Sequence, residues 1–382
     1  MILPRFARAA RLLAAGRLDF TFDRLVFPDR RLGARQATNF LLSRIEARRR
    51  VLRPLSYPIA LQLEPTVRCQ LNCPLCPRER VNGSAAEGLM PFDDYARLLA
   101  EVGPRLLAIA FWQWGEPLLH PRLPEMVALA RRHGILTLLA TNGQTDPDEA
   151  RLGELCEAGL DMLIVALDGV TEEVYRGFRR GGSAAATRRF IAEAARRRDA
   201  RPGADRPLLN ARIIATRDSE PEIDAARAFA RDAGVDLFSI KSVSLYDSAD
   251  PEHAALPAAR HLRSFQYQGT GEAGAYAALP NRCLKPWSWP TLRHDGELLL
   301  CECDHALAHP LGNVFESGSF RAVWRGERAG DLRRAFPADG KVELEFCGRC
   351  RYKLDDAIRE TASLRPVAGV RPLRTLTGAG ER

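Results

Sequence analysis

Short apolar runs alternate with segments of helical periodicity through the middle of the chain. Apolar runs of this length, separated by helical patterns, are typical of strands in parallel βαβ units. The pattern therefore predicts an α/β protein with a parallel sheet. The six runs are 58–63, 106–112, 136–140, 162–167, 211–215 and 237–241.

Cap and turn residues mark the helices between these runs. Asp146 and Pro147 predict the start of a helix, and Gly159 predicts its end. Cys156 falls on the apolar side of that helix, so we expect it to pack in the core.

The pattern changes along the chain and divides it into segments. The first segment looks helical and basic, the second carries the strand and helix alternation, and the third has no clear period. The fourth is rich in cysteine and is expected to form a small domain, followed by a tail. The boundaries are 1–55, 56–245, 246–282, 283–355 and 356–382.

Composition excludes several classes of protein. The chain has 382 residues and a net charge of +8, and its basic residues are spread out rather than clustered, so we expect no nucleic-acid partner. No apolar run approaches the ~18 residues that span a bilayer, and Arg5, Arg8 and Arg11 interrupt the apolar start. We therefore expect a cytoplasmic protein. Its nine cysteines then indicate metal ligation rather than disulfides.

Three cysteines form the most informative motif. Cys69, Cys73 and Cys76 have the spacing C-x3-C-x2-C. Three thiolates on one loop can hold three corners of a cubane iron–sulfur cluster and leave the fourth iron open to a small molecule. The alternatives are a zinc site, whose cysteine pairs usually have C-x2-C spacing, and a disulfide.

This loop resembles the signature of the radical S-adenosylmethionine (radical SAM) family. The segment Trp114-Gly115-Glu116-Pro117 resembles the Gly-Gly-Glu-Pro segment of that family, which binds the methionyl ammonium of SAM. The resemblance implies a partial (β/α)6 barrel with Gly115, Glu116 and Pro117 at the cofactor. It also implies a [4Fe-4S] cluster that binds SAM, cleavage to a 5′-deoxyadenosyl radical, and an electron donor such as flavodoxin or ferredoxin. Leu75 and Trp114 depart from the family pattern.

Two polar residues follow strands of the predicted barrel. Asn142 ends the third run and Asp168 ends the fourth. Polar residues at strand ends commonly line ligand sites, although both residue types are also ordinary turn formers. In similar enzymes these segments lie near the ribose and carboxylate of SAM, so we expect both residues to contact the cofactor.

A second cysteine group follows an Asp-Gly hairpin signal. It resembles the SPASM domain, or its shorter twitch form, which follows the barrel in some radical SAM enzymes. The resemblance implies one auxiliary [4Fe-4S] cluster, and a structural zinc site is the alternative. Cys303 could replace one ligand or remain a thiol beside the site. The expected ligands are Cys283, Cys301, Cys347 and Cys350.

These features together predict a radical SAM oxidoreductase or maturase. One candidate reaction is oxidation of a small molecule, with the auxiliary cluster accepting an electron. The other is modification of a peptide. Residues 1–55 are too short and too helical for a winged-helix peptide-recognition module, which favours the small molecule. A non-catalytic iron–sulfur or zinc-binding protein is the rival class, but it would not need the Gly-Glu-Pro segment.

Overall fold

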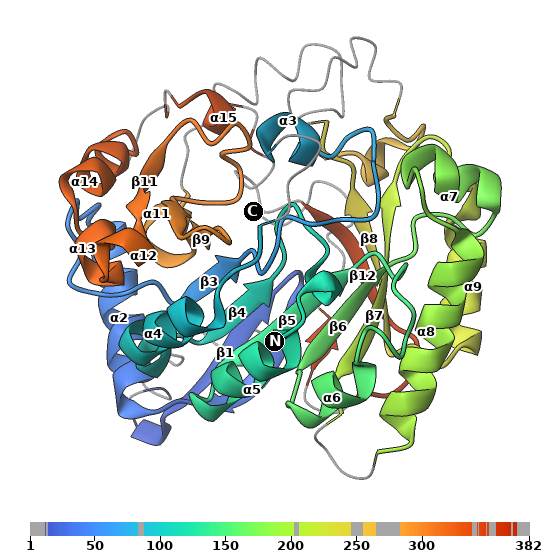
Figure 1. The fold of residues 1–382 in the computed structure, drawn as a ribbon, viewed down its shortest axis with the longest axis horizontal. Helices are drawn as coiled ribbons and strands as arrows, with labels where there is room; N and C mark the ends of the chain where they lie inside the picture. Colours follow the sequence, from blue (N-terminus) through green and yellow to red (C-terminus); the bar gives the residue numbers. More distant parts are fainter. Residues whose placement is uncertain are drawn as a thin grey trace.

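A ten-stranded sheet runs through the part of the chain that the computed structural model describes (Figure 1). Its strand order is β11-β10-β9-β3-β4-β5-β6-β7-β8-β12. The described residues are 12, 14–82, 88–201, 206–245, 255–264, 283–337, 342, 344–348, 350, 357–367 and 370–372.

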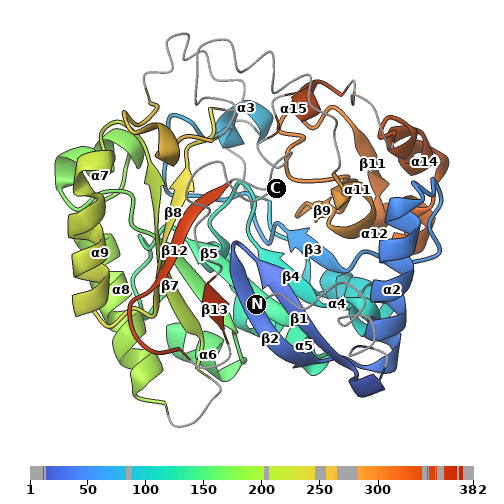
Figure 2. The same ribbon diagram turned by 180° about the vertical axis from the view of Figure 1, so that it is seen from behind.

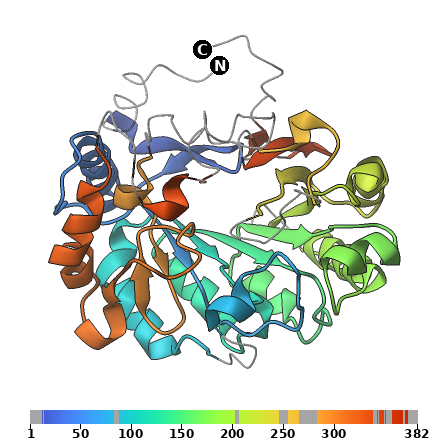
Figure 3. The same ribbon diagram turned by 90° about the horizontal axis from the view of Figure 1, so that it is seen from above.

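The six central strands are parallel and confirm the predicted barrel core. The sheet curves, and the helices cover its outer face (Figure 3). The strands are β3 (Ala60–Leu63), β4 (Ala108–Phe111), β5 (Leu136–Thr141), β6 (Met162–Ala166), β7 (Leu208–Ala215) and β8 (Leu237–Ser242).

Helices follow these strands where the sequence places apolar residues at helical spacing. Helix α4 (Phe92–Val102) buries Tyr95, Leu98, Leu99 and Val102, which lie on one side of the helix. The other helices of this region are α2 (Ala34–Arg48), α3 (Arg78–Asn82), α5 (Leu123–Arg132), α6 (Leu152–Glu157), α7 (Glu172–Phe178), α8 (Ala184–Asp199) and α9 (Ile223–Asp232), with 3-10 turns at Gly103–Arg105, Pro117–Leu119, Glu220–Glu222 and Arg260–Leu262.

The helix expected from Asp146 starts later than predicted. Asp146 accepts a backbone hydrogen bond from Ala150 N in a turn, and α6 begins only at Leu152. Cys156 is 8% exposed on this helix, which confirms that it packs in the core.

The N-terminal segment is predicted to be helical. The structure instead has two strands there, so the prediction is wrong for these residues. β1 (Arg17–Phe22) and β2 (Leu25–Arg31) form an antiparallel hairpin. Leu18, Phe20 and Phe22 are buried and alternate with more exposed residues, which is the period of a strand rather than of a helix. The helical residues in the described part of this segment are 12, 14, 15 and those of α2.

The hairpin lies across one side of the barrel, beside strands from the end of the chain (Figure 2). β12 (Ile358–Ser363) pairs with β8, and β13 (Arg371–Pro372) pairs with β2, both antiparallel. The segment expected to be a tail therefore contributes two strands. Long-range pairing of this kind leaves no local signal in the sequence.

The cysteine-rich segment extends the barrel sheet. Its first strand, β9 (Thr291–Leu292), is parallel to β3, with Gln62 opposite Thr291. The predicted Asp-Gly hairpin is confirmed at Gly296, whose φ is +91°. The remaining elements are β10 (Glu297–Leu299), β11 (Pro310–Asn313), α11 (Lys285–Ser288), α12 (Val314–Ser317), α13 (Phe320–Trp324), α14 (Glu327–Arg334) and α15 (Glu345–Gly348).

Most of the expected bridge, 246–282, lies outside the described residues, apart from 255–264. Among the described helices, none combines the length and the apolar character needed to cross a membrane.

The aromatic packing of the hairpin gives a test of its role. The Phe22 ring lies 5.7 Å from that of Trp289 and 5.8 Å from that of Trp112, measured between centroids. Phe22→Ala should lower the free energy of unfolding by about 3–5 kcal/mol, because it leaves a cavity between the two indoles. Denaturant unfolding measures this. Thr21→Ala, at an exposed position of the same strand, is the control and should change stability by less than about 0.5 kcal/mol. Equal effects would show that the hairpin does not pack as described.

Candidate functional site

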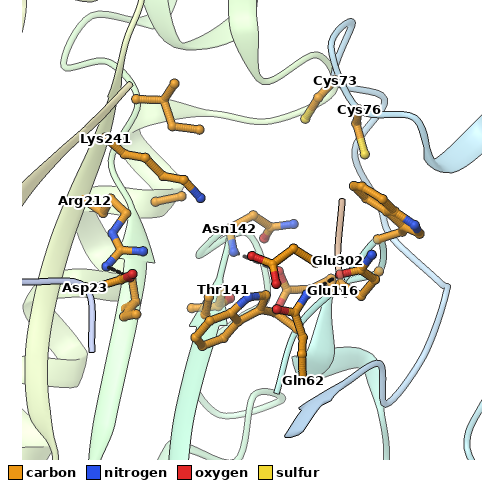
Figure 4. Close-up of a pocket in the computed structure, with 18 of the residues that line it drawn as sticks. Asp23, Gln62, Cys73, Cys76, Glu116, Thr141, Asn142, Arg212, Lys241 and Glu302 are labelled. Carbon is orange, nitrogen blue, oxygen red and sulfur yellow. Dashed lines mark hydrogen bonds and ion pairs between the residues drawn. The ribbon is translucent and has the colours of Figure 1, made fainter. Parts of the chain in front are cut away.

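A cavity of about 590 Å³ lies at the carboxyl ends of the parallel strands (Figure 4). Its wall combines the predicted cysteine loop, the segment 112–116 and the ends of β5 and β6 with the N-terminal hairpin. Lys285, Trp289 and Glu302 contribute from the cysteine-rich domain. A volume of this size is typical of small-molecule sites, roughly 300–1,000 Å³.

The three cysteines of the loop border this cavity and are half-buried. The side-chain amide of Asn142 lies 3.8 Å from Cys69 Sγ, and Arg179 Nη1 lies 3.7 Å from Cys73 Sγ. Burial raises the pKa of Cys69 to about 11 and also raises that of Cys76. Coordination to iron deprotonates a thiol outright, and the nearby N–H donors suit an anionic cluster. The donor set thus fits an iron–sulfur cluster.

Gly115 brings the cofactor segment against the cysteine loop. A Cβ atom at Gly115 would lie 1.9 Å from the carbonyl oxygen of Thr66, so only glycine fits. The next residue, Glu116, donates its backbone N–H to the carbonyl of Arg68 at 2.7 Å. Trp114, which departs from the family pattern, is buried and packs edge-on against the ring of His305 at 5.5 Å.

The carboxylate of Glu116 is buried and accepts two backbone hydrogen bonds. The donors are the N–H groups of Leu118 (3.1 Å) and Asn142 (2.8 Å). Burial raises the pKa of Glu116 to about 7, and the two N–H donors limit that rise. Glu116 therefore links the end of β4 to the end of β5. Pro117 begins the 3-10 turn that follows.

Asp168 is fully buried, and its oxygens are already bonded. It accepts the backbone N–H of Ile214 at 2.7 Å and forms an ion pair with Arg179 at 2.5 Å. Burial opposes the charge of Arg179, but the carboxylate of Asp168 outweighs it, so the pKa of Arg179 stays well above its usual value. Asp168 borders the cavity mainly as a residue that orients Arg179.

The predicted site residues include neither Arg179 nor Glu64, although Arg179 lies in the segment after Asp168 that the resemblance places near SAM. Arg179 follows Asp168 by eleven positions, and only the fold shows that it reaches Cys73. Glu64 is fully buried after β3 and accepts the N–H of Trp114 at 3.2 Å. Its other oxygen lies 2.9 Å from His294 Nδ1. Glu64 therefore joins the cysteine-rich domain to the cofactor segment, and no local pattern marks it.

The second cysteine group gathers in the cysteine-rich domain. Cys301, Cys303 and Cys347 are buried, while Cys283 and Cys350 are half-buried. Cys303 Sγ lies 3.6 Å from Cys350 Sγ. A hydrogen bond with Cys301 keeps the pKa of Cys303 well above its usual value. Cys303 thus lies between two predicted ligands rather than away from them.

The geometry of the thiols bears on the kind of metal site. All nine cysteines lie in the described part of the chain, and none forms a disulfide. Within that part, no three His, Cys, Asp or Glu side chains converge on a point as a single metal ion requires. In a cubane each thiolate binds its own iron, whereas in a structural zinc site all of the thiolates bind one ion.

Family models match two parts of the chain. The radical SAM superfamily model matches residues 63–200, and the SPASM iron–sulfur cluster-binding domain model matches residues 283–351. The chain is a radical SAM protein with a C-terminal SPASM domain. Its cofactors are accordingly SAM, the [4Fe-4S] cluster that binds it, and auxiliary iron–sulfur in the SPASM domain.

Curated relatives match from about half to most of the chain. A PqqA peptide cyclase of Streptomyces rochei is 27% identical over 352 residues, which cover 84% of this chain and 92% of the relative. The tungsten-containing aldehyde ferredoxin oxidoreductase cofactor-modifying protein of Pyrococcus furiosus is 28% identical over 188 residues, 48% of this radical SAM chain. The chain spans about half of that second relative, 51% of its length.

A solved structure shares the fold. Streptococcus suis SuiB bound to precursor peptide SuiA matches with a TM-score of 0.59 at 15% identity, over 84% of this chain and 75% of SuiB. The likeness confirms the expected partial barrel of the radical SAM fold.

The close approach at Gly115 gives a test of the SAM pocket. Gly115→Ala should weaken SAM binding by more than about tenfold, because the new Cβ pushes the cofactor segment away from Thr66. Calorimetric titration of reconstituted protein with SAM measures the change, and iron content reports cluster assembly.

Gly153→Ala is the matched control. Gly153 lies in α6, and an added Cβ there would meet nothing within 4 Å. This variant should bind SAM as the unchanged protein does. A Gly115→Ala protein with normal SAM affinity would contradict the placement of the segment at the cofactor.

Proposed function

We propose that this radical SAM protein modifies a peptide, by oxidising or cross-linking its side chains. The observation that carries the proposal is the similarity to PqqA peptide cyclases. The match to the cyclase of Streptomyces rochei covers 92% of that relative's length. A cavity bordered by both the barrel and the SPASM domain supports it, since a peptide side chain can enter beside the cofactor.

Oxidation of a small molecule is the second candidate. One structural observation favours it: the cavity of about 590 Å³ has a volume typical of small-molecule sites. The relatives outweigh this observation, because they match along most of the chain. The electron donor, a flavodoxin or ferredoxin, stays a prediction.

The residues of the site have separate roles in this proposal. Cys69, Cys73 and Cys76 hold the cluster that binds SAM. Glu116 and Asn142 position the methionyl end of SAM, and Arg179 offers a guanidinium beside Cys73 for its carboxylate. When bound, cluster and SAM supply a radical able to abstract hydrogen from an unactivated carbon.

The walls of the cavity exclude water from this chemistry. Trp112 and Trp289 border it from the barrel and the SPASM domain, and Phe22 packs against both indoles. Excluding water prevents side reactions of a reactive intermediate. The hairpin therefore contributes to function as well as to stability.

Deuterium transfer tests the proposed peptide substrate. Reconstituted protein, SAM and a reductant are incubated with deuterated candidate peptides encoded near the gene. Deuterium should appear in 5′-deoxyadenosine, and the peptide should change in mass, because hydrogen is abstracted from it. Changing Cys69, Cys73 and Cys76 to Ala should remove about four irons and abolish both signals. Deuterium transfer from a small molecule but from no peptide would establish the second candidate instead.

A double substitution tests the role of the auxiliary site. Cys347→Ala with Cys350→Ala should leave SAM cleavage intact but suppress product, if the auxiliary cluster accepts the electron left on the substrate. A single-turnover assay that measures 5′-deoxyadenosine and product together separates the two steps. Cys156→Ala is the control, because Cys156 packs in the core away from both cysteine groups. Parallel loss of cleavage and product would indicate a structural role for the auxiliary site.

A further inference from the structure

One wall of the cavity carries cationic side chains that the proposed SAM site does not use. Arg212 and Ile214 project from alternate positions of β7, and Lys241 is the register partner of Ile214 on β8. All three line the cavity. In the sheet order, β7 and β8 are the fourth and fifth strands beyond β3, the strand that the cysteine loop follows. Figure 4 shows Arg212 and Lys241 across the cavity from Cys73 and Cys76.

Arg212 is buried within an apolar strand, and only some of its N–H groups have partners. It is 8% exposed, and a buried guanidinium is costly unless its charge and its N–H groups have partners. Asp23, in the turn of the N-terminal hairpin, lies 2.7 Å from Nη2 of Arg212. Nε of Arg212 has no hydrogen-bond partner among the described residues. The carboxylate of Asp23 thus neutralises the charge of Arg212. It leaves the Nε–H group of Arg212 without an acceptor among the described residues.

We propose that Arg212 and Lys241 form a subsite for a carboxylate of the substrate. This inference rests on the proposed function and narrows its substrate to one with an acidic side chain, such as a peptide containing Glu or Asp. The guanidinium suits this ligand, because its planar array of N–H donors matches the two oxygens of a carboxylate. Asp23 acts as an internal carboxylate that occupies Arg212 when substrate is absent.

Another ion pair in the walls of this cavity provides a comparison. Lys285 and Glu302 pair at 2.9 Å and border the cavity from the SPASM domain. Removing either Asp23 or Glu302 adds one net positive charge to the cavity. Only removal of Asp23 releases the donors of Arg212, so the two substitutions separate a specific subsite from a general electrostatic effect.

The turn allows a conservative variant at Asp23. Asp23 has a φ of 45°, in the left-handed region that Asn tolerates as readily as Asp. Asp23→Asn therefore removes the charge without straining the hairpin. Arg212→Gln removes the proposed binding group and keeps a polar side chain at that position.

The experiment uses reconstituted protein with SAM bound and two probes, N-acetyl-glutamate amide and N-acetyl-glutamine amide. Their dissociation constants are measured by calorimetry without reductant. The unchanged protein should prefer the glutamate probe by about tenfold or more, the difference typical of a charge-assisted contact. Asp23→Asn should widen this preference, Arg212→Gln should abolish it, and Glu302→Gln should leave it unchanged.

Three outcomes would overturn the subsite. One is equal binding of both probes to the unchanged protein, and another is a preference that survives Arg212→Gln or widens equally in Glu302→Gln. The third is a loss of SAM affinity in Arg212→Gln, which would place Arg212 in the cofactor site. Since no turnover occurs in this assay, its failure is distinct from failure of deuterium transfer from a peptide, which tests the proposed function.

Discussion

The site depends on the close contact between two backbones, that of the cysteine loop and that of the segment after β4. Because Gly115 has no Cβ, its backbone can lie against the carbonyl of Thr66, and Glu116 N can then donate to the carbonyl of Arg68. Glu116 in turn accepts the N–H of Asn142, whose side chain reaches Cys69. A series of short contacts therefore fixes the ends of β3, β4 and β5 relative to the cluster loop.

Contacts around β3 also join the barrel to the SPASM domain. Strand β9 of the SPASM domain continues the barrel sheet beside β3. Glu64, directly after β3, contacts both His294 and the backbone of Trp114. Trp287, fully buried in the SPASM domain, donates its indole N–H to the carbonyl of Val51 at 2.6 Å. Shared strands and buried hydrogen bonds of this kind hold the two cysteine groups in a fixed relation.

Local patterns in the sequence predicted the parts of this structure that local interactions determine. The six parallel strands, the Asp-Gly hairpin and both cysteine groups were predicted, because each is encoded within a few neighbouring residues. The N-terminal hairpin was missed, although Leu18, Phe20 and Phe22 alternate, since its turn at Asp23 and Arg24 lacks the usual Gly or Asn. The pairing of β12 with β8 joins segments more than a hundred residues apart. Contacts of Arg179 and Arg212 also depend on the assembled barrel, so no spacing rule could identify them.

Two ion pairs hold arginine side chains in the wall of the cavity. Asp168 with Arg179 and Asp23 with Arg212 form ion pairs that are largely shielded from solvent. Pairs of this kind contribute little net stability, because removing both charges from water offsets most of their attraction. An apolar wall would serve the barrel equally well as a core. The pairs instead keep guanidinium groups at fixed positions in a cavity that borders the cluster loop, where an arginine without a counterion would be too costly to bury. Their presence is therefore better explained by the binding of charged ligands than by folding.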